Sequence, residues 1–79
     1  MESEEKIDPQ QILFGLNREE DERSLADFLH LFSQDRLSSV LIPRMTDEEI
    51  NRIVDILSNI MRAHLNEKEY HALFLGQPK

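Results

Sequence analysis

The sequence predicts an all-α protein, a compact bundle of four to five helices in an orthogonal or irregular arrangement around one long central helix. Helix-start signals recur along the chain, and between them apolar residues recur at spacings of three and four. Aromatic residues make up only 6% of the 79 residues, so aliphatic side chains must fill the interior. The expected helices differ in length and are joined by short connections, which disfavours a regular up-and-down bundle.

The central helix is expected over about Asp47 to Leu65. Pro43 should push Ile42 out of helical geometry just before this helix. Thr46 and Glu49 have the spacing of a capping box, in which each side chain bonds the backbone N–H of the other residue. The apolar face that follows is broad, so it needs neighbours on more than one side. It contains Ile50, Ile53, Val54, Leu57, Ile60, Met61 and His64.

A short helix is expected near the start of the chain, over about Pro9 to Leu16. Asp8 is placed to cap it, and Pro9 stands at the first helical position, where its missing N–H is not needed. Gly15 weakens this helix by roughly 1 kcal/mol relative to alanine. The helix should therefore form only when it is docked on another element.

A second helix is expected over about Arg18 to Phe32. Asn17 can cap it, and Glu20 is placed to supply the return half of a capping box. Acidic residues fill the first turns, where the helix dipole favours negative charge. The face expected to be buried is formed by Leu25, Phe28, Leu29 and Phe32.

Two conformations compete for Leu37 to Ile42. The apolar residues in this stretch suit a helix of about two turns capped by Ser33, which is the favoured interpretation. The end of the stretch can instead be extended before Pro43. The sequence leaves this choice between helix and extended chain open.

The last helix is expected over about Glu67 to Leu75. Asn66 and Glu69 repeat the capping-box spacing, and Gly76 is placed to stop the helix. The residues expected to be buried are Tyr70, Leu73 and Phe74.

Length and composition predict one domain over residues 7–75, because a chain of this size cannot sustain two cores. Residues 1–6 are expected to form a disordered acidic tail and residues 76–79 a flexible one. The chain has no cysteine, and no signal sequence or membrane-spanning run is visible. These features predict a cytoplasmic protein that does not engage a membrane.

The net charge of −7 weighs against nucleic acid as a partner, because acidic surfaces repel phosphates. A DNA-binding regulator of helix-turn-helix type is kept as the alternative, with Asn66 to Leu75 as its recognition element. In that element, Glu67 and Glu69 would face phosphates with only Lys68 to offset them. The alternative therefore requires the fold to gather four dispersed arginines, Arg36, Arg44, Arg52 and Arg62.

A metal site built from carboxylates and histidines is a further alternative. Asp27 and His30 share a helix face, as do Glu67 and His71, so either pair can supply two ligands. Neither pair has a sequence partner that would complete a coordination shell, so no metal or other cofactor is expected. No enzymatic activity is expected either, because the serines and Thr46 stand as caps or on polar faces and the two glycines form no phosphate-binding loop.

Four apolar residues stand away from the centre of their helix's apolar face: Phe14, Leu31, Ile56 and Leu75. They are either covered by other helices of a small core or converge into a patch that contacts a partner, and the sequence does not choose between the two. The acidic run at residues 19–22, with Glu19 and Glu22 as candidate contacts, can attract a basic partner. The resulting hypothesis is a small acidic protein-interaction module, acting as a regulator, adaptor or inhibitor and also able to form a homodimer.

Overall fold

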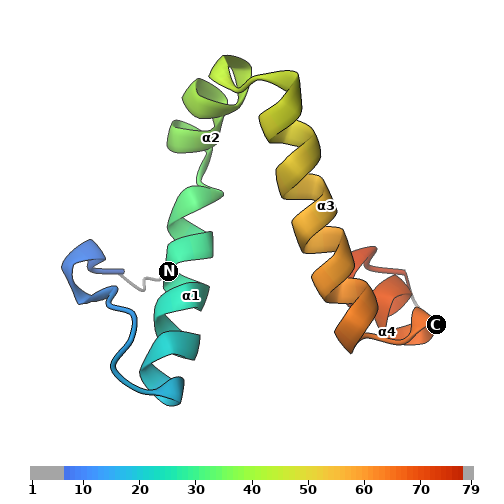
Figure 1. The fold of residues 1–79 in the computed structure, drawn as a ribbon, viewed down its shortest axis with the longest axis horizontal. Helices are drawn as coiled ribbons and strands as arrows, with labels where there is room; N and C mark the ends of the chain where they lie inside the picture. Colours follow the sequence, from blue (N-terminus) through green and yellow to red (C-terminus); the bar gives the residue numbers. More distant parts are fainter. Residues whose placement is uncertain (1–6, 78–79) are drawn as a thin grey trace. The chain divides into compact units, whose positions relative to one another are not determined.

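The computed structural model describes residues 7–77, and these residues form helices and turns without any strand. The expectations for the tail at residues 1–6, and for residues 78 and 79, lie outside this range. The prediction of an all-α protein is confirmed. In chain order (Figure 1) the elements are η1 (Pro9–Gln11), α1 (Arg18–Phe32), α2 (Asp35–Leu41), η2 (Ile42–Arg44), α3 (Asp47–His64), α4 (Glu67–Glu69) and η3 (Tyr70–Phe74).

The chain divides into two units, Met1–Arg44 and Met45–Lys79. The first contains η1, α1, α2 and η2, coloured blue to green in Figure 1, and the second contains α3, α4 and η3, coloured yellow to red.

The first expected helix is much shorter than predicted. Asp8 caps it as expected, with its side chain accepting from the Gln10 N–H at 3.0 Å, but the helix ends after one 3₁₀ turn. Ile12 is already extended, and Gly15 has a φ of +93°, in the left-handed region that glycine adopts without strain. The prediction of a helix to Leu16 is therefore wrong, because residues 13–15 form bonds to α1 in place of helical bonds.

The prediction of α1 is confirmed at both ends. The Asn17 side chain accepts from the Glu20 N–H at 2.8 Å, which is the expected cap. The expected return bond from Glu20 is not formed, since the Glu20 carboxylate accepts from Arg23 on the next turn. Competition from a nearby guanidinium thus replaces one half of the capping box.

Residues 35–44 are helical, which settles the choice between helix and extended chain. The helix α2 begins after Gln34 and has no side-chain cap, so the expected cap at Ser33 is wrong. The Ser33 hydroxyl instead donates to the His30 carbonyl oxygen at 3.1 Å. Ile42 has helical angles (φ −59°, ψ −44°) despite the following Pro43, because the short 3₁₀ turn η2 accommodates the proline that a continued α-helix would not.

The long helix α3 begins where the sequence predicts and ends at His64, one residue before the predicted end at Leu65. Both bonds of its capping box are present: the Glu49 N–H donates to the Thr46 hydroxyl at 3.1 Å, and the Thr46 N–H donates to the Glu49 carboxylate at 2.9 Å. Acidic residues occupy the first turn, and Arg62 and His64 occupy the last. This charge order matches the helix dipole.

The last helix also begins as predicted, with both bonds of the capping box between Asn66 and Glu69 formed at 2.8 and 2.9 Å. It continues as the π-helical segment η3, where the Leu75 N–H donates to the Tyr70 carbonyl five residues back. Gly76 has a φ of +69° and ends the helix as expected.

Packing within the units differs from the expected compact bundle. Ser24 is the one buried side chain among residues 7–77, and no apolar side chain in this range is buried. The expected burial of Leu73 and Phe74 is wrong, because they are 71% and 60% exposed. The helices therefore form by local bonds and caps, while their apolar faces are left without cover inside each unit.

Candidate functional site

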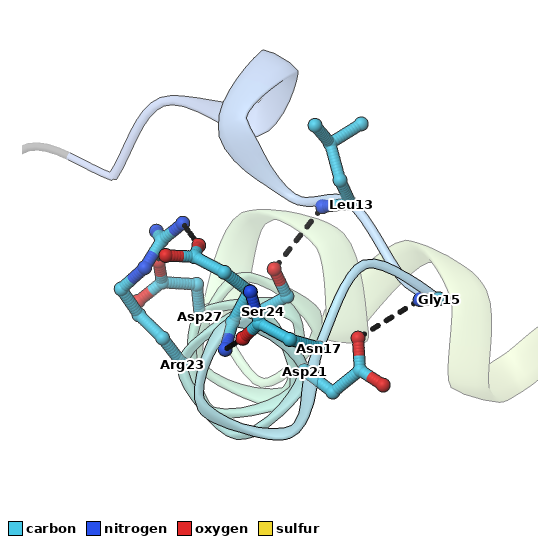
Figure 2. A network of polar contacts seen from close by, with 8 residues as sticks. Leu13, Gly15, Asn17, Asp21, Arg23, Ser24 and Asp27 are labelled. Carbon is cyan, nitrogen blue, oxygen red and sulfur yellow. Dashed lines mark hydrogen bonds and ion pairs between the residues drawn. The ribbon is translucent and has the colours of Figure 1, made fainter.

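The first unit is held together by a strap, residues 12–16, that lies against α1 (Figure 2). The Leu13 N–H donates to the Ser24 hydroxyl oxygen at 3.1 Å, and the Gly15 N–H donates to the Asp21 carboxylate at 2.9 Å. Ser24 is fully buried beneath this strap. Two residues one turn apart on α1 thus accept the Leu13 and Gly15 N–H groups, which lie beyond the last helical bond of η1.

The acidic start of α1 is largely paired with nearby groups. The Arg18 Nε lies 2.7 Å from the Glu22 carboxylate, and both side chains are well exposed. Arg23 lies between Glu20 and Asp27, with the Asp27 carboxylate 3.5 Å away. The hydrogen bond that Arg23 donates to Glu20, with the attraction of both carboxylates, raises the pKa of Arg23 above its ordinary value.

These ion pairs reduce the number of free carboxylates in the acidic run at residues 19–22, which was expected to attract a basic partner. Of the two predicted contacts, Glu22 already has a local cation, whereas Glu19 has no ion pair within the part of the chain that the structure describes. Surface pairs such as that of Arg18 and Glu22 exchange readily with solvent and with other charges. The acidic run at residues 19–22 can therefore attract a basic partner mainly through the net charge of the first unit.

The apolar face of α1 is open. Leu25, Phe28 and Leu29 are between 44% and 49% exposed, and Phe32 is half-buried. The rings of Phe28 and Phe32 stack at a centroid distance of 6.4 Å. This face therefore presents a preformed aromatic pair flanked by leucines, the residue types that anchor protein contacts.

The apolar face of α3 is wider and is also open. Its residues follow a seven-residue repeat: Ile50, Leu57 and His64 occupy one core position, and Ile53 and Ile60 the other. The face is extended on one side by Val54 and Met61 and on the other by Ile56 and Ala63. Five of these side chains are 37% to 53% exposed, namely Ile50, Val54, Ile56, Leu57 and Ile60, whereas Ile53 and Met61 are half-buried. The second unit leaves the five exposed side chains open, while Met61 lies at the turn into α4 with Leu65 and Tyr70.

A hollow of about 380 Å³ lies where the chain turns from α3 into α4. Leu65 and Tyr70 are half-buried at its wall, and Tyr70 stacks on Phe74 at a centroid distance of 5.4 Å. The size suits one large side chain of a partner. The full lining is Ser58, Met61, Arg62, Leu65, Asn66, Glu67 and Tyr70.

The four apolar residues predicted as partner contacts are no more exposed than the other apolar residues of the helices. Phe14, Ile56 and Leu75 are between 43% and 55% exposed, and Leu31 is half-buried. Two of them belong to each unit, so their convergence into one patch stays a prediction. Residues at the centres of the apolar faces, such as Phe28 and Leu57, are equally exposed but were not predicted as contacts, because periodicity marks a face without showing whether anything covers it.

The residues of the two alternatives can be compared within each unit. Among residues 7–77, no three potential metal ligands gather at one place. Asp27 pairs with Arg23, and the His71 ring contacts Tyr70 edge-on at 5.8 Å. Two of the four arginines fall in each unit. Along α3, Arg52 and Arg62 are ten residues apart, roughly 15 Å along the helix axis.

Comparison of this chain with protein-family models, with curated proteins and with solved structures found no match. Within residues 7–77, no helix combines the length and the apolar composition that crossing a membrane requires. The candidate site therefore rests on the geometry of the chain itself, namely the open apolar faces of α1 and α3.

Proposed function

We propose that this protein is a cytoplasmic interaction module that acts by binding other proteins through the apolar faces of α1 and α3, as a regulator, adaptor or inhibitor. One observation carries the proposal. Seventeen large apolar side chains are 37% to 71% exposed, and none is buried in residues 7–77. The compact bundle expected from the sequence is, in this proposal, completed by the partner.

The size of the open apolar surface supports a contact function. Complete burial of a leucine or isoleucine contributes about 1.5–3 kcal/mol, so covering a half-exposed one contributes about 1 kcal/mol. Leu25, Phe28 and Leu29 on α1 are all close to half exposed. A partner that covered them would gain several kcal/mol before the cost of association. Single exposed apolar residues are ordinary, but contiguous faces on two helices mark contact sites.

Charge favours a partner with a basic rim around its apolar contact. The first unit carries ten acidic and five basic residues, a net charge of −5, and the second carries six and four, a net charge of −2; together they make up the −7 of the whole chain. The face of α1 thus belongs to the more acidic unit. Attraction of this kind accelerates encounter and weakens as salt is added.

The proposal is tested by affinity capture from extract of the native cell with the intact chain as bait. The matched variants are Phe28→Ala, on the open face of α1, and His30→Ala, on the opposite side of the same helix; both residues are exposed. Alanine preserves the helix in each case. We expect a protein retained by the parent and by His30→Ala, lost with Phe28→Ala, and released by added salt.

Other results would refute the proposal. Retention of the same material by Phe28→Ala would exclude the α1 face as the contact. Capture of DNA in place of protein would favour the helix-turn-helix alternative, and a thermal shift with zinc that a chelator reverses would favour the metal alternative.

A further inference from the structure

We infer that a second copy of this chain covers the apolar face of α3, with the two α3 helices antiparallel. The inference rests on the proposed function, because it names the partner of one of the two contact faces. It assigns α3 to self-association and leaves the face of α1 for a different protein.

The sequence of α3 is complementary to itself in the antiparallel direction. In antiparallel helix pairs, one core position of the seven-residue repeat packs against the other core position. Ile50 of one copy then lies opposite Ile60 of the second copy, and Ile53 lies opposite Leu57. The two-fold axis then lies at the level of position 55, so Ile56 lies one residue from the axis and near its own equivalent on one side of the core. The four central core layers of the pair are each filled by two aliphatic side chains, and the layer at each end places His64 opposite Thr46.

Charge selects the antiparallel direction over the parallel one. The first turn of α3 contains Asp47, Glu48 and Glu49, and its last turn contains Arg62 and His64. A parallel pair would place three carboxylates beside three carboxylates at one end. An antiparallel pair places the acidic turn of each copy beside the basic turn of the other and also opposes the helix dipoles.

The charge of the unit is compatible with a second copy. The unit that contains α3 carries only −2 of the total charge of −7. Repulsion between two such units is therefore weak, whereas pairing through the other unit would bring together two surfaces of −5.

The exposed area also matches what a dimer requires. Ile50, Val54, Ile56, Leu57 and Ile60 are 37% to 53% exposed. At this exposure each presents on the order of 90 Å², so the five present roughly 450 Å² of apolar surface. A standard interface buries about 800 Å² per partner, a little more than half of it apolar. The face of α3 alone supplies that apolar share.

The first test is sedimentation equilibrium of the intact chain from about 1 to 100 µM, in a range where most specific dimers assemble. We expect a species of twice 9.3 kDa at the upper end. Leu57→Glu, which acts twice in each dimer, should raise the dissociation constant by at least about 100-fold. The control Asn51→Glu adds the same charge on the exposed polar side of α3 and should change it by less than about threefold.

The second test measures orientation with mild substitutions that leave the helix intact. Because the chain has no cysteine, introduced ones are unique. Ile56→Cys should form a disulfide with its own copy, whereas Glu49→Cys should not, since the antiparallel copies of position 49 are about 20 Å apart. A mixture of Glu49→Cys and Ala63→Cys should link across the pair. A parallel pair would instead link positions 49 and 56 at similar rates.

Each outcome decides the inference. A species near 9.3 kDa throughout, or equal linking at positions 49 and 56, overturns it. If the monomer still captures a protein that depends on Phe28, the inference fails and the proposed function stands. If it captures none, both fail.

Discussion

Replacement of Ser24 by alanine tests how the first unit is assembled. Ser24 is the one side chain buried in residues 7–77, and its hydroxyl oxygen accepts the Leu13 N–H at 3.1 Å. The Ser24→Ala variant removes this acceptor. The Leu13 N–H, which the strap directs toward α1, then has no partner. Of the two hydrogen bonds between the strap and α1 among residues 7–77, the one from the Gly15 N–H to the Asp21 carboxylate then remains.

The magnitude follows from the cost of an unsatisfied donor. Leaving a partly buried N–H without its acceptor costs about 1–2 kcal/mol. That cost appears in the equilibrium between the docked and the opened strap, so opening becomes roughly 5- to 30-fold more frequent. Alanine is a better helix former than serine by up to about 0.5 kcal/mol, so α1 itself should not be weakened.

The assay is backbone amide hydrogen exchange followed by NMR, at fixed protein concentration. We expect exchange at Leu13 and Gly15 to accelerate by that factor in Ser24→Ala, while amides in the middle of α3 are unaffected. Ser39→Ala is the matched control, because Ser39 is exposed on α2 and gains the same helix propensity. Asp21→Asn, which keeps an acceptor oxygen for the Gly15 N–H, should accelerate exchange less than Asp21→Ala does.

Unchanged exchange at Leu13 in Ser24→Ala would refute this reasoning. It would mean that the strap is held by its own conformation and that the buried hydroxyl contributes nothing to docking.

Three further changes test the local bonds of the helices. Thr46→Ala should destabilise the start of α3 by about 1 kcal/mol, seen as faster amide exchange at Glu49, because it removes the capping side chain. Gly76→Ala should cost about 1 kcal/mol through the positive φ alone, since an added Cβ would meet nothing within 4 Å; urea titration followed by circular dichroism measures it. Arg18→Gln should change stability by less than about 0.5 kcal/mol in the same titration, because its pair with Glu22 is well exposed.

The starts of α1, α3 and α4 were predictable because each depends on residues three positions apart. The bonds between Thr46 and Glu49, and between Asn66 and Glu69, are present as the spacing predicts. The acceptor for the Glu20 N–H was also predicted, but the destination of the Glu20 carboxylate was not. Arg23 lies on the next turn of the same helix, and spacing alone does not rank a cation against a backbone N–H.

The prediction of the first helix failed because residues 13–15 bond to side chains of α1 and not to backbone groups of their own helix. Leu13 finds its acceptor in Ser24, eleven residues along the chain, and Gly15 finds its acceptor in Asp21. A local pattern contains no information about such bonds. A proline and a capping aspartate at the start were enough for one turn only.

The candidate site likewise combines features that the local sequence determines with features that only tertiary contacts determine. From the sequence alone follow the helical class, the bounds of α1 and α3, the direction of each apolar face and the charge of each helix end, because all of these arise from neighbours within one or two turns. Only the tertiary structure decided that residues 12–16 leave the helix to cover Ser24, and that the faces around Phe28 and Leu57 are open. Burial depends on contacts between distant segments, and periodicity specifies only the side of the helix on which such contacts must be made.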